Sequence, residues 1–271
     1  MVVGQNTLGN RTFATINGVI MLVIMFITLY PFWYAVVGSF NEGVDYLRGG
    51  VNFWPRTWSM QNYRAVFSTN EILAAYRVSV ARTVIATVVH LFVVSTFAYA
   101  FSRRNLVFRN VYAAMGLIGL FFQSGVIPEY FVLRSLGLLN TFWVYVFPPA
   151  FNFFSVIIFA SFFRELPASL HESARIDGAR ELTVFARIVV PLSKPVFAAI
   201  ALFTAVWNWN DYRMSLIFTT DESLKVVQLF LLQVINSTRR ATDMGAAQAA
   251  AASAGGGNRT VSITVQLATM V

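Results

Sequence analysis

Few residues of this sequence have the type and spacing that catalysis requires. The chain contains two histidines, His90 and His171, and no cysteine, and this set does not supply the ligands of a usual zinc site. Its serine, histidine and acidic residues form no recognisable nucleophilic triad. Its lysines are Lys194 and Lys225, and neither precedes a serine or threonine as the lysine of a phosphate-binding loop does. We therefore expect no catalytic residue, no metal site and no cofactor bound by this chain.

Amide and aromatic side chains offer binding chemistry instead. Amides hydrogen-bond to hydroxyl groups and aromatic rings present apolar faces, so the two together suit a ligand such as a sugar. The alternative is structural, because aromatic rings commonly lie at the level of lipid headgroups and amides commonly pack membrane helices together. The candidate residues of a polar path are Gln123, Asn152, Trp207, Asn208, Trp209 and Asn210.

The composition places the chain in a lipid bilayer. Hydrophobic residues make up 57% of the 271 residues and charged residues 12%, whereas soluble domains carry about 25% charged residues. We expect one integral membrane domain over residues 1–271, surrounded by lipid. The net charge of +8 does not indicate nucleic-acid binding, because much of the basic excess lies in short loops beside apolar runs.

Segments of about 20 apolar residues are long enough to cross the bilayer as helices. We expect the fifth to fray near Trp207, and residues 128–139 to form a short connecting helix. Residues 219–259 predict a long loop outside the membrane, and the apolar tail 261–271 predicts a sixth helix that is cut short. The predicted fold is therefore all-α and integral to the membrane, with about six transmembrane helices. The first five spans are 16–40, 76–101, 110–127, 141–163 and 195–217.

Loop charge predicts the orientation. Basic residues are dense between the second and third spans and again in residues 164–194, between the fourth and fifth. The positive-inside rule places both loops and the N-terminus in the cytoplasm, and residues 219–259 on the outer side of the inner or plasma membrane. The basic residues are Arg103, Arg104 and Arg109 in the first loop, and Arg164, Arg175, Arg180, Arg187 and Lys194 in the second.

Residues 164–194 have the pattern of a helix–turn–helix. Strong helix formers occupy 168–176, and Gly178 stops this helix because glycine readily adopts the left-handed backbone. Residues 179–189 predict a second helix with an apolar stripe, which ends near Pro191. Such an amphipathic element either lies on the lipid surface or docks on a partner, and the pattern alone leaves both open.

The residues of this segment resemble the EAA loop of binding-protein-dependent ABC importer permeases. The family pattern is Glu-Ala-Ala, a glycine four residues after the second alanine, and then an isoleucine and a proline. The chain departs from it at Ser173, where a small residue replaces alanine, and at Val190, where leucine is usual. The runs 176–179, 137–141 and 207–210 are similar to permeases of the carbohydrate type. The matching positions are Glu172, Ala174, Gly178, Ile188 and Pro191.

The resemblance implies that residues 164–194 are a coupling loop that docks in a cleft of a cytoplasmic ATPase subunit. Glu172 would then pair with the ATPase, and Ala174 and Gly178 would permit close approach and the turn. Phe185 and Ile188 would anchor the loop to the membrane domain. The whole set of implied coupling residues is Glu172, Ser173, Ala174, Asp177, Gly178, Phe185, Ile188 and Pro191.

The resemblance also implies partners. They are a second permease subunit, two ATPase subunits that bind ATP and Mg²⁺, and an extracytoplasmic solute-binding protein facing residues 219–259. The substrate class it implies is an oligosaccharide, and the similarity is greatest to permeases for acidic oligosaccharides such as alginate fragments. Basic residues of the predicted outer loop suit an acidic ligand, although they are as readily explained as solvated. They are Arg213, Lys225, Arg239 and Arg240.

Two other classes of function remain open at this point. An ion-coupled secondary transporter usually places carboxylates within its spans, and the acidic residues of this chain lie in loops or at span ends. A membrane scaffold that transports nothing would not need the coupling loop. Co-purification of an ATPase would separate the importer permease from both.

Overall fold

The computed structural model describes residues 8–47, 49–67, 70–103, 105–122 and 124–237. All regular elements in these residues are helices, apart from an isolated β-bridge between Asn41 and Trp58. Gln123, Arg104, Arg239, Arg240 and the apolar tail 261–271 lie outside the described residues. The chain divides into two compact units, one from Leu73 to Phe230 and the other comprising the chain before and after it.

The first unit contains α1 (Leu8–Ser39), a helix of 32 residues with Pro31 inside it. Its apolar side chains are exposed on every side except near its C-terminal end, and none of its most apolar window is buried. A helix that is apolar on every side suits a hydrocarbon environment. The predicted first span is therefore a helix, and it begins eight residues earlier than residue 16.

An ordered segment follows α1 and is organised by Asn41. The buried Asn41 Oδ1 accepts hydrogen bonds from the backbone N–H groups of Arg56 and Thr57 at 2.9 and 3.1 Å. Its Nδ2 donates to Asp45 at 3.0 Å, and Asp45 also pairs with the Arg56 guanidinium. This segment carries α2 (Gly43–Leu47) and α3 (Gln61–Phe67). One buried amide thus fixes a loop that has little apolar core.

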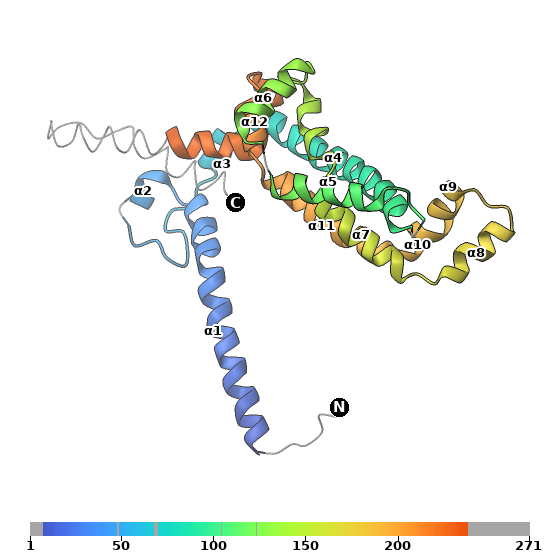
Figure 1. The fold of residues 1–271 in the computed structure, drawn as a ribbon. Helices are drawn as coiled ribbons and strands as arrows, with labels where there is room; N and C mark the ends of the chain where they lie inside the picture. The colour runs from blue at the N-terminus through green and yellow to red at the C-terminus, as the bar shows by residue number, and fades with distance from the viewer. Residues whose placement is uncertain (1–7, 48, 68–69, 104, 123, 238–271) are drawn as a thin grey trace. The chain divides into compact units, whose positions relative to one another are not determined.

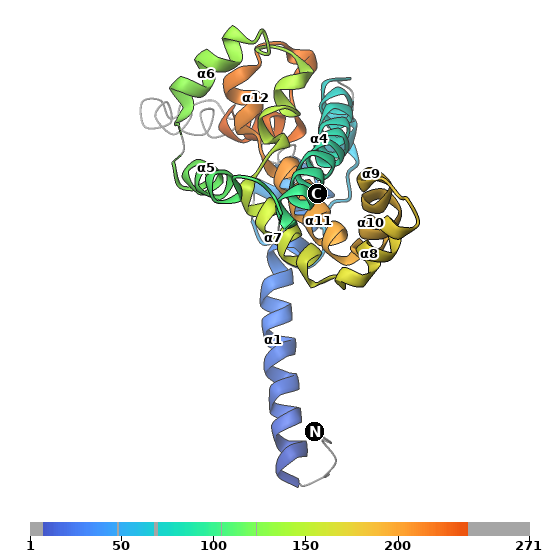
Figure 2. The ribbon, with the colours of Figure 1, turned by 45° about the vertical axis from the view of Figure 1, so that its right-hand side comes forward.

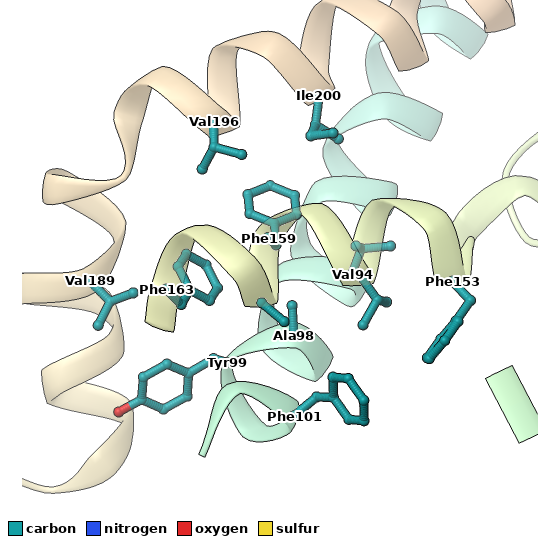
Figure 3. Close-up of a cluster of buried hydrophobic side chains, with 12 residues drawn as sticks. Val94, Ala98, Tyr99, Phe101, Phe153, Phe159, Phe163, Val189, Val196 and Ile200 are labelled. Carbon is teal, nitrogen blue, oxygen red and sulfur yellow. The ribbon is translucent and has the colours of Figure 1, made fainter. Parts of the chain in front are cut away.

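Three helices form the centre of the second unit. Figures 1 and 2 both show α4 (Asn70–Ser102), α7 (Phe153–Glu165) and α11 (Lys194–Asn210) side by side. Their facing side chains form an aromatic-rich core (Figure 3), in which the Phe159 and Phe197 ring centres lie 4.7 Å apart. Close packing of this kind holds membrane helices together, since burial from lipid adds little.

The third predicted span differs from the structure. Helix α5 (Arg109–Phe121) ends early, and α6 (Val126–Ser135) begins after Gly125, which has a positive φ of 76°. Helix α5 packs against α7 through Gly116, where a Cβ would lie 2.3 Å from the Phe153 ring. Only glycine permits this approach.

The fourth span is interrupted at Pro148-Pro149, as predicted. The short elements η1 (Phe142–Tyr145) and η2 (Pro148–Ala150) precede α7, and the two halves meet at an angle of 51°. His90 of α4 holds this break, because its Nδ1 lies 2.9 Å from the Pro149 carbonyl oxygen and its Nε2 lies 3.2 Å from Ser155 Oγ. The buried histidine therefore has a structural role here.

The predicted fifth span, residues 195–217, is interrupted three residues after Trp207, close to where it was predicted to fray. Helix α11 continues through this residue to Asn210, and the chain breaks at Asp211 before α12 (Arg213–Phe218). Arg82 of α4 sets this position, since its guanidinium donates to the Asp211 carbonyl at 2.6 Å and pairs with the carboxylate. The guanidinium carbon also lies 4.8 Å from the centre of the Tyr145 ring.

Residues 219–237 are more ordered than the predicted loop. They contain η4 (Glu222–Leu224) and an apolar helix, Val227–Ser237. Val226, Val227 and Leu229 are buried, and the Val227 N–H donates to Ser79 Oγ of α4 at 2.8 Å. Charged residues just before this helix hide its apolar stretch in the sequence.

The described residues contain two helices that are each long and apolar enough to cross a membrane. They are Gly9–Ser39 and Asn70–Ser102, and up to five spans result if each bent pair of helices is one span. This arrangement agrees with the predicted all-α membrane fold.

Breaking the Arg82–Asp211 pair should destabilise the second unit. Their side chains are 1% and 11% exposed, so Arg82→Met leaves a carboxylate buried without its partner, at a cost of about 3–5 kcal/mol. We expect a lower midpoint of thermal unfolding for the purified protein. The midpoint is measured by size-exclusion chromatography of samples heated to increasing temperatures. Arg82→Met combined with Asp211→Leu should recover part of the loss. If the double variant is as unstable as the single one, the stranded charge is not the cause.

Candidate functional site

The segment between α7 and α11 projects from one end of the three-helix core, and α6 and α12 lie at the other end (Figures 1 and 2). We call residues 164–194 the coupling segment, after the role that the resemblance implies for it. Its first helix after α7 is α8 (Ala168–Ile176), whose first residue follows Pro167. The segment then turns at Gly178 and returns through a second helix toward α11, so it has the predicted helix–turn–helix form.

The turn after α8 is a Schellman motif. Gly178 has a φ of +75°, and its N–H donates to the Arg175 carbonyl at 3.0 Å. The Ala179 N–H donates to the Ala174 carbonyl at 2.9 Å, which completes the pair of bonds that defines this helix end. A Cβ at residue 178 would meet no atom within 4 Å. Glycine is therefore required here for its backbone conformation and not for space within this chain.

The return helix consists of three consecutive elements without a gap between them. They are α9 (Glu181–Val184), the π-helix η3 (Phe185–Val189) and α10 (Val190–Leu192). The prediction that this helix ends near Pro191 holds only approximately, because Pro191 lies within α10. A bend of 81° follows, between Leu192 and Lys194 at the start of α11. The π-turn lies just before the proline, where an ordinary helix would strain against its ring.

The implied coupling residues divide between an outer and an inner face. Glu172, Ser173 and Asp177 are exposed, and none of the described residues pairs with the Glu172 carboxylate. Two large apolar side chains beside the turn are also exposed, Ile176 at 86% and Leu182 at 77%. Apolar side chains this exposed at a turn favour a contact with something outside this chain.

The inner face attaches the segment to the membrane core. Ala174 is buried, Ile188 is half-buried and Phe185 packs against the core cluster. The Phe185 ring centre lies 5.0 Å from that of Tyr99 in α4. Phe185 thus contacts α4, and the anchoring role that the resemblance implies for it stays a prediction.

A polar cluster at the end of α4 holds both helices of the segment. The Tyr99 hydroxyl donates to Glu181 Oε2 of α9 at 2.8 Å and lies 2.9 Å from His171 Nε2 of α8. Arg103 donates to the Tyr99 oxygen and, at 3.3 Å, to Glu181. Figure 3 shows the Tyr99 hydroxyl directed away from the other core residues. We call Tyr99, Arg103, His171 and Glu181 the Tyr99 cluster.

Charge and burial act on the two titratable groups of the segment in this cluster. The hydrogen bond from Tyr99 holds the pKa of the Glu181 carboxyl below its usual value, and the positive charge of Arg103 acts in the same direction. Burial lowers the pKa of His171, and Arg103 lowers it further, although Glu181 opposes this. Glu181 is therefore ionised and His171 neutral at neutral pH.

The candidate residues of the polar path do not form one site. Asn152 caps α7, because its side chain accepts hydrogen bonds from the Phe154 and Ser155 N–H groups, and it lines a cavity of about 220 Å³. Asn210 donates to the Val206 carbonyl of its own helix, and Trp209 lies 6.2 Å from the Tyr76 ring. Trp207 is exposed. Gln123 lies outside the described residues.

Asn208 differs from the other candidates. It is 1% exposed, and neither atom of its amide has a hydrogen-bond partner among the described residues. A buried amide without partners is costly, so such a group commonly serves a ligand or an interface.

The Tyr99 cluster was not predicted from the sequence. Loop charge was the only role predicted for Arg103, and none was predicted for Glu181 or Tyr99. The signal in the sequence is weak, because the cluster joins residues 72 and 82 positions apart. The one local sign is a tyrosine four residues before an arginine at the end of a span.

Comparison with known proteins identifies the chain. Residues 9–258 match the family described as "Binding-protein-dependent transport system inner membrane component". The chain belongs to this family. Its members are permease subunits of transport systems and not enzymes, so this chain is a membrane permease of an ABC importer.

Relatives support the assignment over most of the permease. The chain is 40% identical to Protein LplC of Bacillus subtilis (strain 168), over 85% of this chain and 78% of that protein. It is 37% identical to the polygalacturonan/rhamnogalacturonan transport system permease protein YtcP of the same organism, over 83% of this chain and 79% of that protein. The ion-coupled transporter and the scaffold are thereby not favoured.

A solved structure agrees with the fold. It is described as a bacterial ABC transporter involved in the import of the acidic polysaccharide alginate. The permease resembles one of its chains with a TM-score of 0.84 and 25% identity, covering 99% of this chain and 94% of that one.

The left-handed turn predicts a specific sensitivity at Gly178. Gly178→Ala should loosen the turn by about 1–2 kcal/mol, so trypsin should cleave after the exposed Arg175 and Arg180 at least five times faster in the isolated permease. Gly178→Asn should have a smaller effect, because asparagine tolerates this conformation. Gly18→Ala, at a helical glycine with open space around it, is the control. Equal cleavage of all variants would contradict the role of the turn.

The Tyr99 cluster predicts that acid loosens the coupling segment. The folded state binds the His171 proton less readily than the unfolded state, so the stabilisation is present above the ordinary pKa of 6.5 and is lost as the pH falls below it. Because the chain has no cysteine, spin labels on Ala168→Cys and Asn105→Cys can report the distance between α8 and the end of α4. We expect a broader and longer distribution at pH 5.5 than at pH 7.5.

The matched variant is His171→Gln, which keeps a polar side chain and removes the titration. Its distance distribution should not change between the two pH values. A wild-type response that persists in this variant would assign the effect to another group.

Proposed function

We propose that this permease is driven by ATPase subunits that bind the exposed face of the coupling segment. The proposal rests on two features of the coupling segment, an exposed tip at its turn and a fixed attachment to α4. The tip presents Glu172, Ile176 and Leu182 around the Gly178 turn, and the Tyr99 cluster ties its two helices to α4. A force on the tip is therefore carried to a helix that is 33 residues long.

The chemistry of the tip suits a protein partner. An unpaired carboxylate beside exposed apolar side chains provides an apolar contact with one directional ion pair, as in the core and rim of protein interfaces. A lipid surface would place the apolar side chains on one side and basic residues around them. The exposed residues beside Ile176 and Leu182 carry both signs of charge, and the acidic Glu172 and Asp177 among them favour a protein partner over an anionic lipid surface. ATP and Mg²⁺ belong to that partner in this proposal.

We further propose that the transported substrate is an acidic oligosaccharide. The support comes from YtcP, whose name refers to polygalacturonan and rhamnogalacturonan, and from the structural relative that imports alginate. The Asn208 amide has no hydrogen-bond partner among the described residues, and because it is 1% exposed a sugar hydroxyl would reach it only when the helices around it move apart. The remaining partners are a second permease subunit and an extracytoplasmic solute-binding protein, with the N-terminus of this chain in the cytoplasm.

The proposal predicts that Glu172→Lys abolishes coupling without loss of the permease. The complete importer, reconstituted in liposomes with its solute-binding protein, should lose at least about nine-tenths of its ATP-driven uptake of oligogalacturonate or oligoalginate. A neutral malto-oligosaccharide should not be taken up by the wild type. The ATPase subunits should co-purify poorly with the variant, because the reversed charge removes their ion pair.

The control is Glu165→Lys, which makes the same charge change at an exposed residue at the end of α7. It should retain both uptake and the ATPase. If Glu172→Lys retains both as well, the docking role is refuted. Uptake of the neutral sugar in place of the acidic ones would refute only the substrate.

A further inference from the structure

Two arginines at the end of the three-helix core share one aromatic ring. The guanidinium carbons of Arg109 in α5 and Arg164 in α7 each lie 5.6 Å from the centre of the Phe101 ring. Phe101 stands on the last turn of α4, where Figure 3 shows it at the edge of the core, and it is 7% exposed. Arg164 also donates to the Phe101 carbonyl at 3.5 Å. Three helices thus place two positive charges beside the same ring.

Nothing in the described chain neutralises this pair. Arg56, Arg82 and Arg103 each pair with a carboxylate, whereas neither Arg109 nor Arg164 has an acidic partner among the described residues. The first turn of α5 contains no acidic residue. Two like charges held beside one ring repel each other, so the arrangement favours an anion that contacts both.

Exposed apolar side chains adjoin one of the two arginines, Arg109. Val107 and Phe108 directly precede α5, and they are 69% and 70% exposed. Apolar side chains next to basic ones, at the end of membrane helices, are typical of the boundary between acyl chains and headgroups. A free phosphate ion would need the arginines but would gain nothing from Val107 and Phe108.

We propose that Arg109 and Arg164 bind the headgroup phosphate of an anionic phospholipid. The lipid lies in the leaflet on the side of the coupling segment, and Val107 and Phe108 contact its acyl chain. Basic pockets between membrane helices bind such headgroups through the same combination of charge and apolar contact. The site joins α4, α5 and α7 where the coupling segment begins, and it does not depend on the nature of the transported substrate.

The test is lipid binding to the complete importer by native mass spectrometry. Phosphatidylglycerol, with phosphatidylcholine as the neutral comparison, is titrated onto the purified complex. Wild type should bind phosphatidylglycerol preferentially, and Arg109→Gln/Arg164→Gln should bind it roughly 30-fold more weakly. Arg77→Gln/Arg134→Gln removes the same charge at exposed arginines outside this site, and it should bind like wild type.

Two further arms identify the source of the phosphate. Val107→Ser/Phe108→Ser should also weaken phosphatidylglycerol binding, and inorganic phosphate at the same concentration should not displace the lipid. Displacement by inorganic phosphate, with no effect of the serine variant, would overturn the lipid and leave a simple anion site.

Other outcomes also overturn the proposal. Unchanged phosphatidylglycerol binding by the arginine double variant refutes the site, and loss of a protein subunit in place of lipid shows that the pair is a protein interface. If the double variant does not assemble, Arg109→Gln and Arg164→Gln are measured singly, and each should weaken binding about five-fold.

Discussion

The hydroxyl group of Tyr99 is the contact on which the position of the coupling segment depends. Ala174 and Val184 are the buried residues of α8 and α9, so packing fixes these helices only weakly. The Tyr99 oxygen instead meets His171 of α8 and Glu181 of α9 at once. Because both partners share one atom, neither helix can shift against the other or against α4 without breaking a hydrogen bond, and the bond to the Glu181 carboxylate is charge-assisted.

Two further features restrict movement within the coupling segment. The Schellman turn at Gly178 closes α8, and the return helix runs unbroken from Glu181 to Leu192 before the 81° bend into α11. Phe185 meets the Tyr99 ring on the way. A displacement of the tip therefore has two continuous routes into the membrane, one to α4 through hydrogen bonds and one to α11 through the backbone. Contiguous packed elements of this kind are the physical basis on which distant sites are coupled.

The sequence predicted the features that depend on local chemistry. Gly178 ends α8 because few other residues adopt its backbone, and Pro148-Pro149 interrupts the fourth span because proline cannot donate a hydrogen bond. Features set by distant residues were missed. Helix α11 ends at Asn210 because Arg82 of α4 binds the next residue, Asp211, across 129 residues. The helix Val227–Ser237 forms because its start is buried against α4, which no local pattern records.

A polar side chain within a membrane helix suggests a functional site by default. In this permease, the hydrogen-bond partners of each such side chain indicate whether its role is structural. Arg82 pairs with Asp211, and His90 bonds to Pro149 and Ser155, so both are accounted for as links between helices. Asn208 is equally buried, yet its amide has no partner among the described residues. A buried amide is costly unless it is hydrogen-bonded, so Asn208 is a buried amide of α11 whose stability the described residues do not explain.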